Sequence, residues 1–131
     1  IPIEAAKGNL AGIKVLLVDD APDNRLFIKR LLMHSGAAVD IAENGSEAVL
    51  YALSRSYDVI LMDLQMPILD GHGATRELRS KGYKEPIIAL TAHAMNEERE
   101  RCIHSGFNGF LTKPVDQSLL IGTVANFAHS R

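Results

Sequence analysis

Four short runs of apolar, mostly branched residues constrain the fold of this chain more than any other feature. They cover residues 13–18, 59–62, 87–90 and 110–111, and polar residues follow each run at once. Strands that are apolar throughout are typical of a parallel sheet covered by helices on both faces. A weaker run at residues 39–42 alternates between apolar and polar side chains, which is typical of an edge strand.

Helical patterns occupy the stretches between these runs. Apolar residues recur at helical spacing within residues 26–31, 48–53, 74–78, 95–103 and 119–127. Gly36, Gly82 and Gly106 supply stop signals after three of these patterns, and Asn44 and Ser46 can cap the start of the second. Alternation of strands and helices at this spacing predicts an α/β fold with a parallel sheet and right-handed crossovers.

Length and charge narrow the class of protein further. The 131 residues suffice for one domain, and 47% hydrophobic with 23% charged residues is the composition of a globular protein. The formal net charge of -2 leaves no cationic surplus for neutralising phosphates. Binding of nucleic acid by this chain alone is therefore not expected.

The single cysteine, Cys102, cannot form an internal disulfide, which agrees with a reducing, cytoplasmic location. No apolar run approaches the roughly 18 residues that span a bilayer, and the first residues lack the layout of a signal peptide. Residues 1–9 lack periodicity and are interpreted as a linker, with the domain at residues 10–131. Because the chain starts at Ile1, we expect it to be a segment of a longer protein.

Five polar residues stand at the carboxyl ends of the predicted strands. Asp19 and Asp20 follow the first run, and Asp63 follows the third strand. Thr91 follows the fourth strand, and Lys113 follows the fifth. This edge is where open parallel α/β sheets bind their ligands, so the five residues predict one site.

The residue types at this edge indicate phosphoryl chemistry. Three neighbouring carboxylates repel one another unless a cation neutralises them, and hard oxygen ligands suit Mg2+. The sequence spacing contains no His/Cys cluster typical of zinc, which disfavours a transition metal. Asp63 could attack phosphorus to form an aspartyl phosphate, with Thr91 and Lys113 contacting the charged phosphoryl oxygens.

Other acidic and histidine side chains are expected to have structural roles. Asp23, Asp40 and Asp70 are interpreted as helix caps or turn formers, and Asp19 could itself cap the first helix. The histidines are scattered through the sequence and are expected on the surface, although His93 lies close enough to Thr91 to border the site.

Taken together, these motifs resemble the receiver domain of two-component response regulators. The resemblance extends over residues 12–127 and rests on residues 15–20, 61–67 with Asp70-Gly71, 90–92 and 112–114. It implies a flavodoxin-like (βα)5 three-layer sandwich with a five-stranded parallel sheet of order 2-1-3-4-5.

The resemblance also assigns roles to the acidic residues. Asp63 matches the phosphoacceptor of the family. Asp20 and Asp63 would bind Mg2+ directly, the backbone carbonyl of Gln65 would be the third protein ligand, and Asp19 would hold the ion through water.

Further roles follow for the opposite side of the site. Thr91 and Lys113 match the phosphate-binding pair, and the Lys113–Pro114 bond is expected to be cis. Thr91 and Phe110 match the switch residues, but Phe110 replaces the tyrosine that is common there and lacks its hydroxyl group. His72 and the following glycine also depart from the usual bulkier pair, and the sequence offers no mechanism for this difference.

The resemblance implies a partner and a parent protein. The partner would be a helical domain that carries a phosphohistidine, either a kinase dimerisation domain or a phosphotransfer protein, docking near Leu26 and Phe27. Arg25, Cys102 and the run 91–95 resemble receivers of hybrid sensor histidine kinases, whose parent protein can be membrane-bound. A receiver assists its own phosphorylation and dephosphorylation, so whether to class this chain as an enzyme stays open.

Four alternatives stand beside this interpretation. A haloacid-dehalogenase-like phosphatase also uses an aspartyl-phosphate intermediate, but its nucleophile follows the first strand in an Asp-x-Asp pattern. A nucleotide or flavin binder would need a glycine-rich or Walker motif that the sequence lacks. A degenerate receiver could serve for docking only, although the acidic set is intact. A free-standing receiver is the alternative to hybrid-kinase origin.

Overall fold

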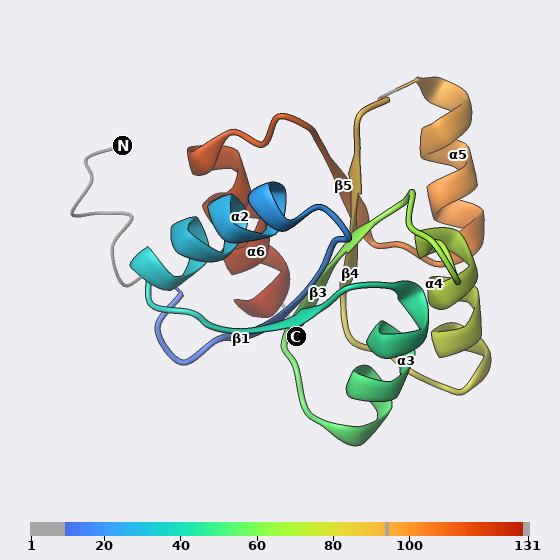
Figure 1. Cartoon of the computed structure of the whole chain (residues 1–131), viewed down its shortest axis with the longest axis horizontal. Helices are drawn as coiled ribbons and strands as arrows, with labels where there is room; N and C mark the ends of the chain where they lie inside the picture. Colours follow the sequence, from blue (N-terminus) through green and yellow to red (C-terminus); the bar gives the residue numbers. More distant parts are fainter. Residues whose placement is uncertain (1–9, 94, 130–131) are drawn as a thin grey trace.

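Strands and helices alternate along the whole described chain (Figure 1). The computed structural model describes residues 10–93 and 95–129. The elements are β1 (Lys14–Val18), α2 (Pro22–His34), β2 (Ala38–Ala42), α3 (Gly45–Ser54), β3 (Val59–Asp63), α4 (Gly71–Ser80), β4 (Ile87–Thr91), α5 (Asn96–Ser105), β5 (Gly109–Thr112) and α6 (Gln117–His129).

The five strands form one parallel sheet in the order β2-β1-β3-β4-β5. Helices α2 and α6 cover one face of the sheet, and α3, α4 and α5 cover the other (Figure 1). The predicted flavodoxin-like sandwich is therefore confirmed, including the edge position of the alternating strand β2. No helix among residues 10–93 and 95–129 is both long and apolar enough to cross a membrane.

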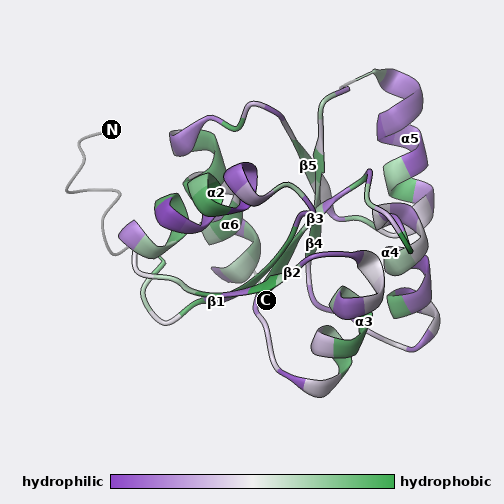
Figure 2. Cartoon of the chain, in the orientation of Figure 1, coloured by the Kyte–Doolittle hydropathy of each residue, from purple (hydrophilic) through white to green (hydrophobic). Residues whose placement is uncertain are grey.

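Side chains of each central strand alternate between two apolar clusters. Val15 and Leu17 pack beneath α2 and α6, whereas Leu16 and Val18 pack beneath α3 and α4. All four are inaccessible to solvent, and Figure 2 shows the apolar colouring concentrated in the sheet and on the inner helix faces. Burial on both faces explains why the central strands are apolar apart from their terminal residues.

Helix ends follow the predicted signals in several places. The Asn44 side chain accepts a 2.9 Å hydrogen bond from the backbone N–H of Glu47 and caps α3. The Asp70 side chain caps α4 by accepting from the backbone N–H of Gly73. Gly106 ends α5 with a φ of 106°, the left-handed conformation that glycine adopts without a Cβ clash.

The prediction for Asp40 is wrong. This residue lies inside β2 and accepts a 2.6 Å hydrogen bond from the Tyr57 hydroxyl. It also pairs with Arg55 at 3.3 Å and Lys14 at 3.9 Å. Asp40 therefore neither caps a helix nor forms a turn. Its contacts link β2 to residues at the end of the sheet opposite the predicted site.

The predicted apolar face of the first helix is also displaced. Ile28 and Leu32 are fully buried and anchor α2 to the sheet, whereas Leu26 and Phe27 are about half exposed. The periodicity was ambiguous because α2 carries more apolar residues than its buried face can accommodate. The predicted linker, residues 1–9, lies outside the described residues.

Candidate functional site

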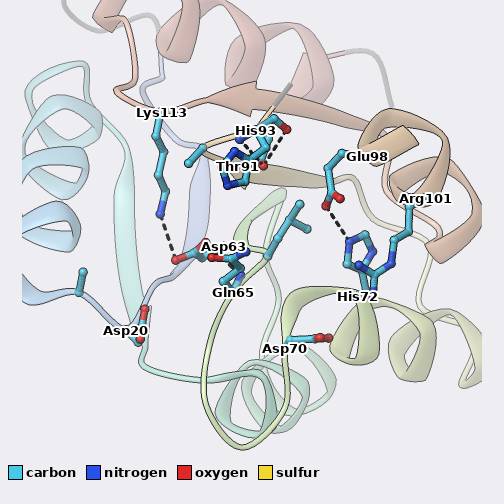
Figure 3. A pocket seen from close by; sticks show the side chains of 13 residues that line it. Asp20, Asp63, Gln65, Asp70, His72, Thr91, His93, Glu98, Arg101 and Lys113 are labelled. Atoms are coloured by element: carbon cyan, nitrogen blue, oxygen red, sulfur yellow. Dashed lines mark hydrogen bonds and ion pairs between the residues drawn. The ribbon is translucent and has the colours of Figure 1, made fainter. Parts of the chain in front are cut away.

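All five predicted site residues meet at the carboxyl edge of the sheet. Asp63 and Thr91 are the last residues of β3 and β4, Asp19 and Asp20 follow β1, and Lys113 follows β5. A cleft of about 440 Å3 opens at this edge, and all of these residues except Asp19 line it (Figure 3). The parallel register of the strands produces this convergence.

Three carboxylates form the acidic side of the cleft. Asp19, Asp20 and Asp63 each offer one oxygen atom, and these oxygens lie within 4.8 Å of one another. Asp19 is inaccessible to solvent and Asp63 is 6% exposed, whereas Asp20 is exposed. An all-oxygen group of this kind fits a hard divalent cation such as Mg2+.

Hydrogen bonds fix the buried carboxylate of Asp19. Its Oδ1 accepts from the backbone N–H of Ala21 at 2.9 Å, and its Oδ2 accepts from the Asn24 side chain. Arg25 donates to the Asp19 carbonyl at 3.0 Å. The N-cap position of α2 is Ala21, so the alternative in which Asp19 caps this helix is wrong.

Lys113 reaches into the acidic group. Its Nζ lies 3.0 Å from Asp63 Oδ2 and 3.5 Å from Asp19 Oδ2. Burial raises the pKa of the Asp63 carboxyl above its ordinary value, while the hydrogen bond and charge of Lys113 oppose that rise. The predicted cis Lys113–Pro114 bond, which follows directly, is confirmed.

Thr91 and Gln65 flank Asp63. The Thr91 hydroxyl donates to the carbonyl of His93 and accepts from its N–H, both at 3.0 Å. The backbone N–H of Gln65 donates to Asp63 Oδ1 at 3.3 Å. His93 lines the cleft as expected (Figure 3).

Phe110 lies on β5, beside the cleft rather than in it. The ring is half-buried, and the Arg99 guanidinium of α5 lies over it at 4.7 Å from the ring centroid. A neighbouring cavity of about 320 Å3 is lined by Phe110, Arg99, Ile103 and Phe107. The aromatic side chain therefore has open volume beside it.

The expectation that the histidines lie on the surface is wrong for His72. This side chain is 2% exposed and lies between α4 and α5. Its Nδ1 lies 2.7 Å from Ser105 Oγ, and its Nε2 lies 3.1 Å from Glu98 Oε1. His72 and Glu98 also line the cleft (Figure 3). Glu98 and Ser105 lie seven residues apart on one face of α5, but only packing brings His72 to that face.

Fold and site together define an α/β domain whose parallel sheet presents an acidic group, a hydroxyl and a lysine at one cleft. The family model for the response regulator receiver domain matches residues 15–125. The chain belongs to this family of phosphoacceptor domains in two-component signalling. This assignment favours the receiver over the haloacid-dehalogenase-like alternative.

Two curated relatives differ greatly in length. The sensor protein GacS of Pseudomonas syringae pv. syringae is 40% identical over 116 residues, which are 85% of this chain and 13% of that protein. An uncharacterised 14.6 kDa protein of Leptolyngbya boryana is 41% identical over 121 residues, which are 90% of this chain and 92% of that protein. The chain thus spans about an eighth of the first relative and nearly all of the second.

Two solved structures share the fold. The receiver domain of the sensor histidine kinase PA1611 from Pseudomonas aeruginosa, with a magnesium ion in its active-site cleft, has 40% identity and a TM-score of 0.84. The match covers 91% of this chain and 99% of that domain. The receiver domain of Ssk1 from Saccharomyces cerevisiae, in complex with the histidine phosphotransfer protein Ypd1, has 30% identity and a TM-score of 0.82, covering 89% of each chain.

Proposed function

We propose that Asp63 accepts a phosphoryl group from a phosphohistidine. One observation carries this proposal. The Asp63 carboxylate lines the cleft close to two other carboxylates and to Lys113, whose Nζ is 3.0 Å away. This position gives the nucleophile a cation-binding group on one side and a cationic partner for the phosphoryl oxygens on the other.

The donor set fits Mg2+ as the cofactor. Asp20 and Asp63 would hold the ion directly, Gln65 would add its backbone carbonyl, and Asp19 would act through water. When bound, the ion would neutralise the crowded carboxylates and the phosphoryl charge. The fixed orientation and complete burial of Asp19 agree with a supporting role behind the more exposed Asp20.

The transfer step requires one bond to form and one to break. An oxygen of Asp63 attacks phosphorus, the phosphorus–nitrogen bond of the donor breaks, and the imidazole leaves with the electron pair. Lys113 then contacts a phosphoryl oxygen instead of the free carboxylate. The Thr91 hydroxyl contacts another oxygen after its hydrogen bond to the His93 carbonyl is released.

Receiver domains pair with phosphotransfer proteins, as Ssk1 does with Ypd1. For this chain, the partner would be a helical domain with a phosphohistidine, either a kinase dimerisation domain or a phosphotransfer protein. Its docking surface would include Leu26 and Phe27, which are about half exposed on α2 beside the cleft. The parent would be a cytoplasmic or membrane-bound hybrid sensor kinase, with this domain in the cytoplasm.

Incubation with acetyl phosphate and Mg2+, followed by intact mass measurement, tests the proposed function. We expect one phosphoryl group per chain, which base treatment removes because acyl phosphates are labile. Asp63→Asn should take up no phosphate, and Asp70→Asn is its matched control, because Asp70 also lines the cleft and caps α4. The control should be phosphorylated like the native chain. Absence of phosphate from the native chain, or phosphate stable to base, would contradict the proposal.

A further inference from the structure

A second group of metal-ligand side chains lies between α4 and α5. His72, Glu98 and Cys102 each offer one ligand atom, and these three atoms lie within 4.8 Å of one another. His72 and Cys102 are buried, at 2% and 3% exposed, and the Glu98 side chain is 26% exposed. The phosphoacceptor chemistry uses none of these residues.

Two elements build this group. Glu98 and Cys102 are four residues apart on α5, so their side chains share the face of the helix that packs toward α4. His72 is the second residue of α4 and reaches them across the interface between the helices. Glu98 and Cys102 follow His72 by 26 and 30 residues. This separation explains why no local zinc motif appears in the sequence.

The hydrogen bonds of His72 are compatible with metal binding through Nε2. Ser105 Oγ lies 2.7 Å from Nδ1, and Arg76 lies 3.5 Å from the same hydroxyl oxygen. When Nδ1–H donates to Ser105, the Nε2 lone pair faces the Glu98 carboxylate at 3.1 Å. In the other tautomer, Nε2–H donates to Glu98 and Nδ1 accepts from Ser105. The first tautomer leaves the Nε2 lone pair free to bind a metal, and a donated Nδ1–H is the usual support for a metal-binding imidazole.

We propose that His72, Glu98 and Cys102 bind Zn2+ at the α4–α5 interface. Imidazole nitrogen, thiolate sulfur and carboxylate oxygen are the ligands that zinc prefers, whereas Mg2+ accepts oxygen ligands. Zinc bonds of about 2.0 to 2.3 Å place tetrahedral ligand atoms roughly 3.3 to 3.8 Å apart, and the three ligand atoms here lie within 4.8 Å of one another.

The proposed zinc site borders the cleft. His72 and Glu98 line that cavity together with Asp63 and Thr91, so water can complete the coordination (Figure 3). Binding replaces the Cys102 proton by the metal and releases that proton to solvent. A bound ion would cross-link α4 to α5 beside the phosphorylation site and restrain the movement of α5.

Titration of the reduced full chain with Co2+, as a spectroscopic stand-in for zinc, tests this proposal. Saturating Mg2+ keeps the acidic group occupied during the titration. We expect one equivalent of Co2+ to produce a thiolate-to-cobalt charge-transfer band, which zinc then abolishes by displacement. Cys102→Ala should lose the band, and His72→Gln and Glu98→Gln should weaken the apparent affinity by about tenfold or more.

His104→Gln is the matched control, because His104 is an exposed histidine on the same helix. It should bind Co2+ as the native chain does. Thermal unfolding without metal checks that each variant folds. Glu98→Gln should fold, because glutamine has the size of glutamate and position 98 is partly exposed. Binding without a thiolate band would overturn the proposal, since it would place the ion at carboxylates alone. Unchanged Co2+ affinity in both His72→Gln and Glu98→Gln would also overturn the proposal. His72, Glu98 and Ser105 would then form a hydrogen-bonded network only.

Discussion

At the scale of single residues, Asp63 is held between opposing influences. Burial raises the pKa of its carboxyl, and Asp19 adds to that rise, while Lys113 and the Gln65 N–H oppose it. The net direction is upward, so the ionised carboxylate is less favourable in the folded chain than in the unfolded chain. For the proposed nucleophile, this means a negative charge that is incompletely compensated before the substrate arrives.

The charge at Asp63 should therefore cost stability in metal-free buffer. The folded pKa is raised, so the folded state binds the proton more tightly, and lowering the pH from about 7 toward about 4 should favour folding at this residue. Asp63→Asn should unfold at a higher temperature than the native chain at neutral pH, with the difference shrinking as the pH falls. Thermal unfolding in EDTA measures this, and a lower midpoint for the variant at neutral pH would contradict the stated environment.

Mg2+ affinity should depend on Asp20. Asp20→Ala removes a charged oxygen ligand, and we expect the affinity to fall by at least about tenfold, a loss that even outer-shell changes can produce. Amide NMR shifts can follow the titration because the chain contains no tryptophan. Asp23→Ala, an exposed carboxylate in the first turn of α2, is the control and should bind normally. Equal Mg2+ affinity in the native chain, Asp20→Ala and Asp23→Ala would show that Asp20 has only a structural role.

At the scale of elements, α2 separates its packing face from its exposed face. Ile28 and Leu32 are fully buried, whereas Leu26, Phe27 and Met33 are about half exposed. Leu26 and Phe27 lie near the amino end of α2, which follows the acidic group directly, while Met33 lies at the far end. Exposed apolar side chains beside a reaction site are a common basis for partner recognition.

Substitution of these residues should separate docking from chemistry. Leu26→Ala with Phe27→Ala should slow phosphotransfer from a phosphohistidine protein by about tenfold, equivalent to about 1.4 kcal/mol, because a few anchor residues carry most of the binding energy at an interface. Phosphorylation by acetyl phosphate should be unchanged, and Met33→Ala should behave like the native chain with both donors. Equal loss with both donors would show damage to the site instead.

The loop between β3 and α4 brings two backbones into close contact. A Cβ at Gly71 would overlap the Asp63 carbonyl oxygen, which is backbone and cannot move aside easily. Gly71→Ala should therefore destabilise the fold by about 1–3 kcal/mol and impair phosphorylation. Gly122 on α6 has open space around it, so Gly122→Ala should stabilise the helix by about 0.5–1 kcal/mol. Denaturant unfolding measures the change in the free energy of unfolding for each variant. Similar changes in the two variants would contradict the stated packing.

At the scale of the whole molecule, the cleft extends from the carboxyl edge of the sheet to α5. Thr91 lies at the end of β4, Phe110 lies on β5, and the Arg99 guanidinium of α5 covers the Phe110 ring. A phosphoryl group would draw the Thr91 hydroxyl away from His93 and free space near the ring. Without a hydroxyl, Phe110 would gain no hydrogen bond on turning inward, so packing and the contact with Arg99 would set its position.

Phosphorylation should therefore change the surface around α5. Beryllofluoride with Mg2+ imitates the phosphoryl group, and we expect amide NMR shifts to reach α5 and β5 in the native chain. In Phe110→Ala these distant shifts should be smaller, because the ring that couples β5 to α5 is absent. Shifts confined to residues around Asp63 would contradict the switch, and equal distant shifts in the variant would exclude a role for the ring.

The sequence predicted the sheet and the cleft for one physical reason. Strands buried on both faces must be apolar throughout, so their ends, and the polar residues that follow, are visible without coordinates. Helix faces were harder to predict, because α2 carries apolar side chains on more than one face, as Leu26 and Ile28 show. His72 could not be assigned, since its partners come from a different helix and only packing brings them together.

Locating the phosphoryl group within the chain tests the central claim most directly. Borohydride reduces an aspartyl phosphate, but not a free carboxylate, to homoserine. The native chain should be phosphorylated with acetyl phosphate and Mg2+, reduced, digested and sequenced by mass spectrometry. We predict homoserine at position 63 and aspartate at positions 19 and 20. Homoserine at either of those two positions, with Asp63 unmodified, would contradict the assignment of Asp63 as the phosphoacceptor.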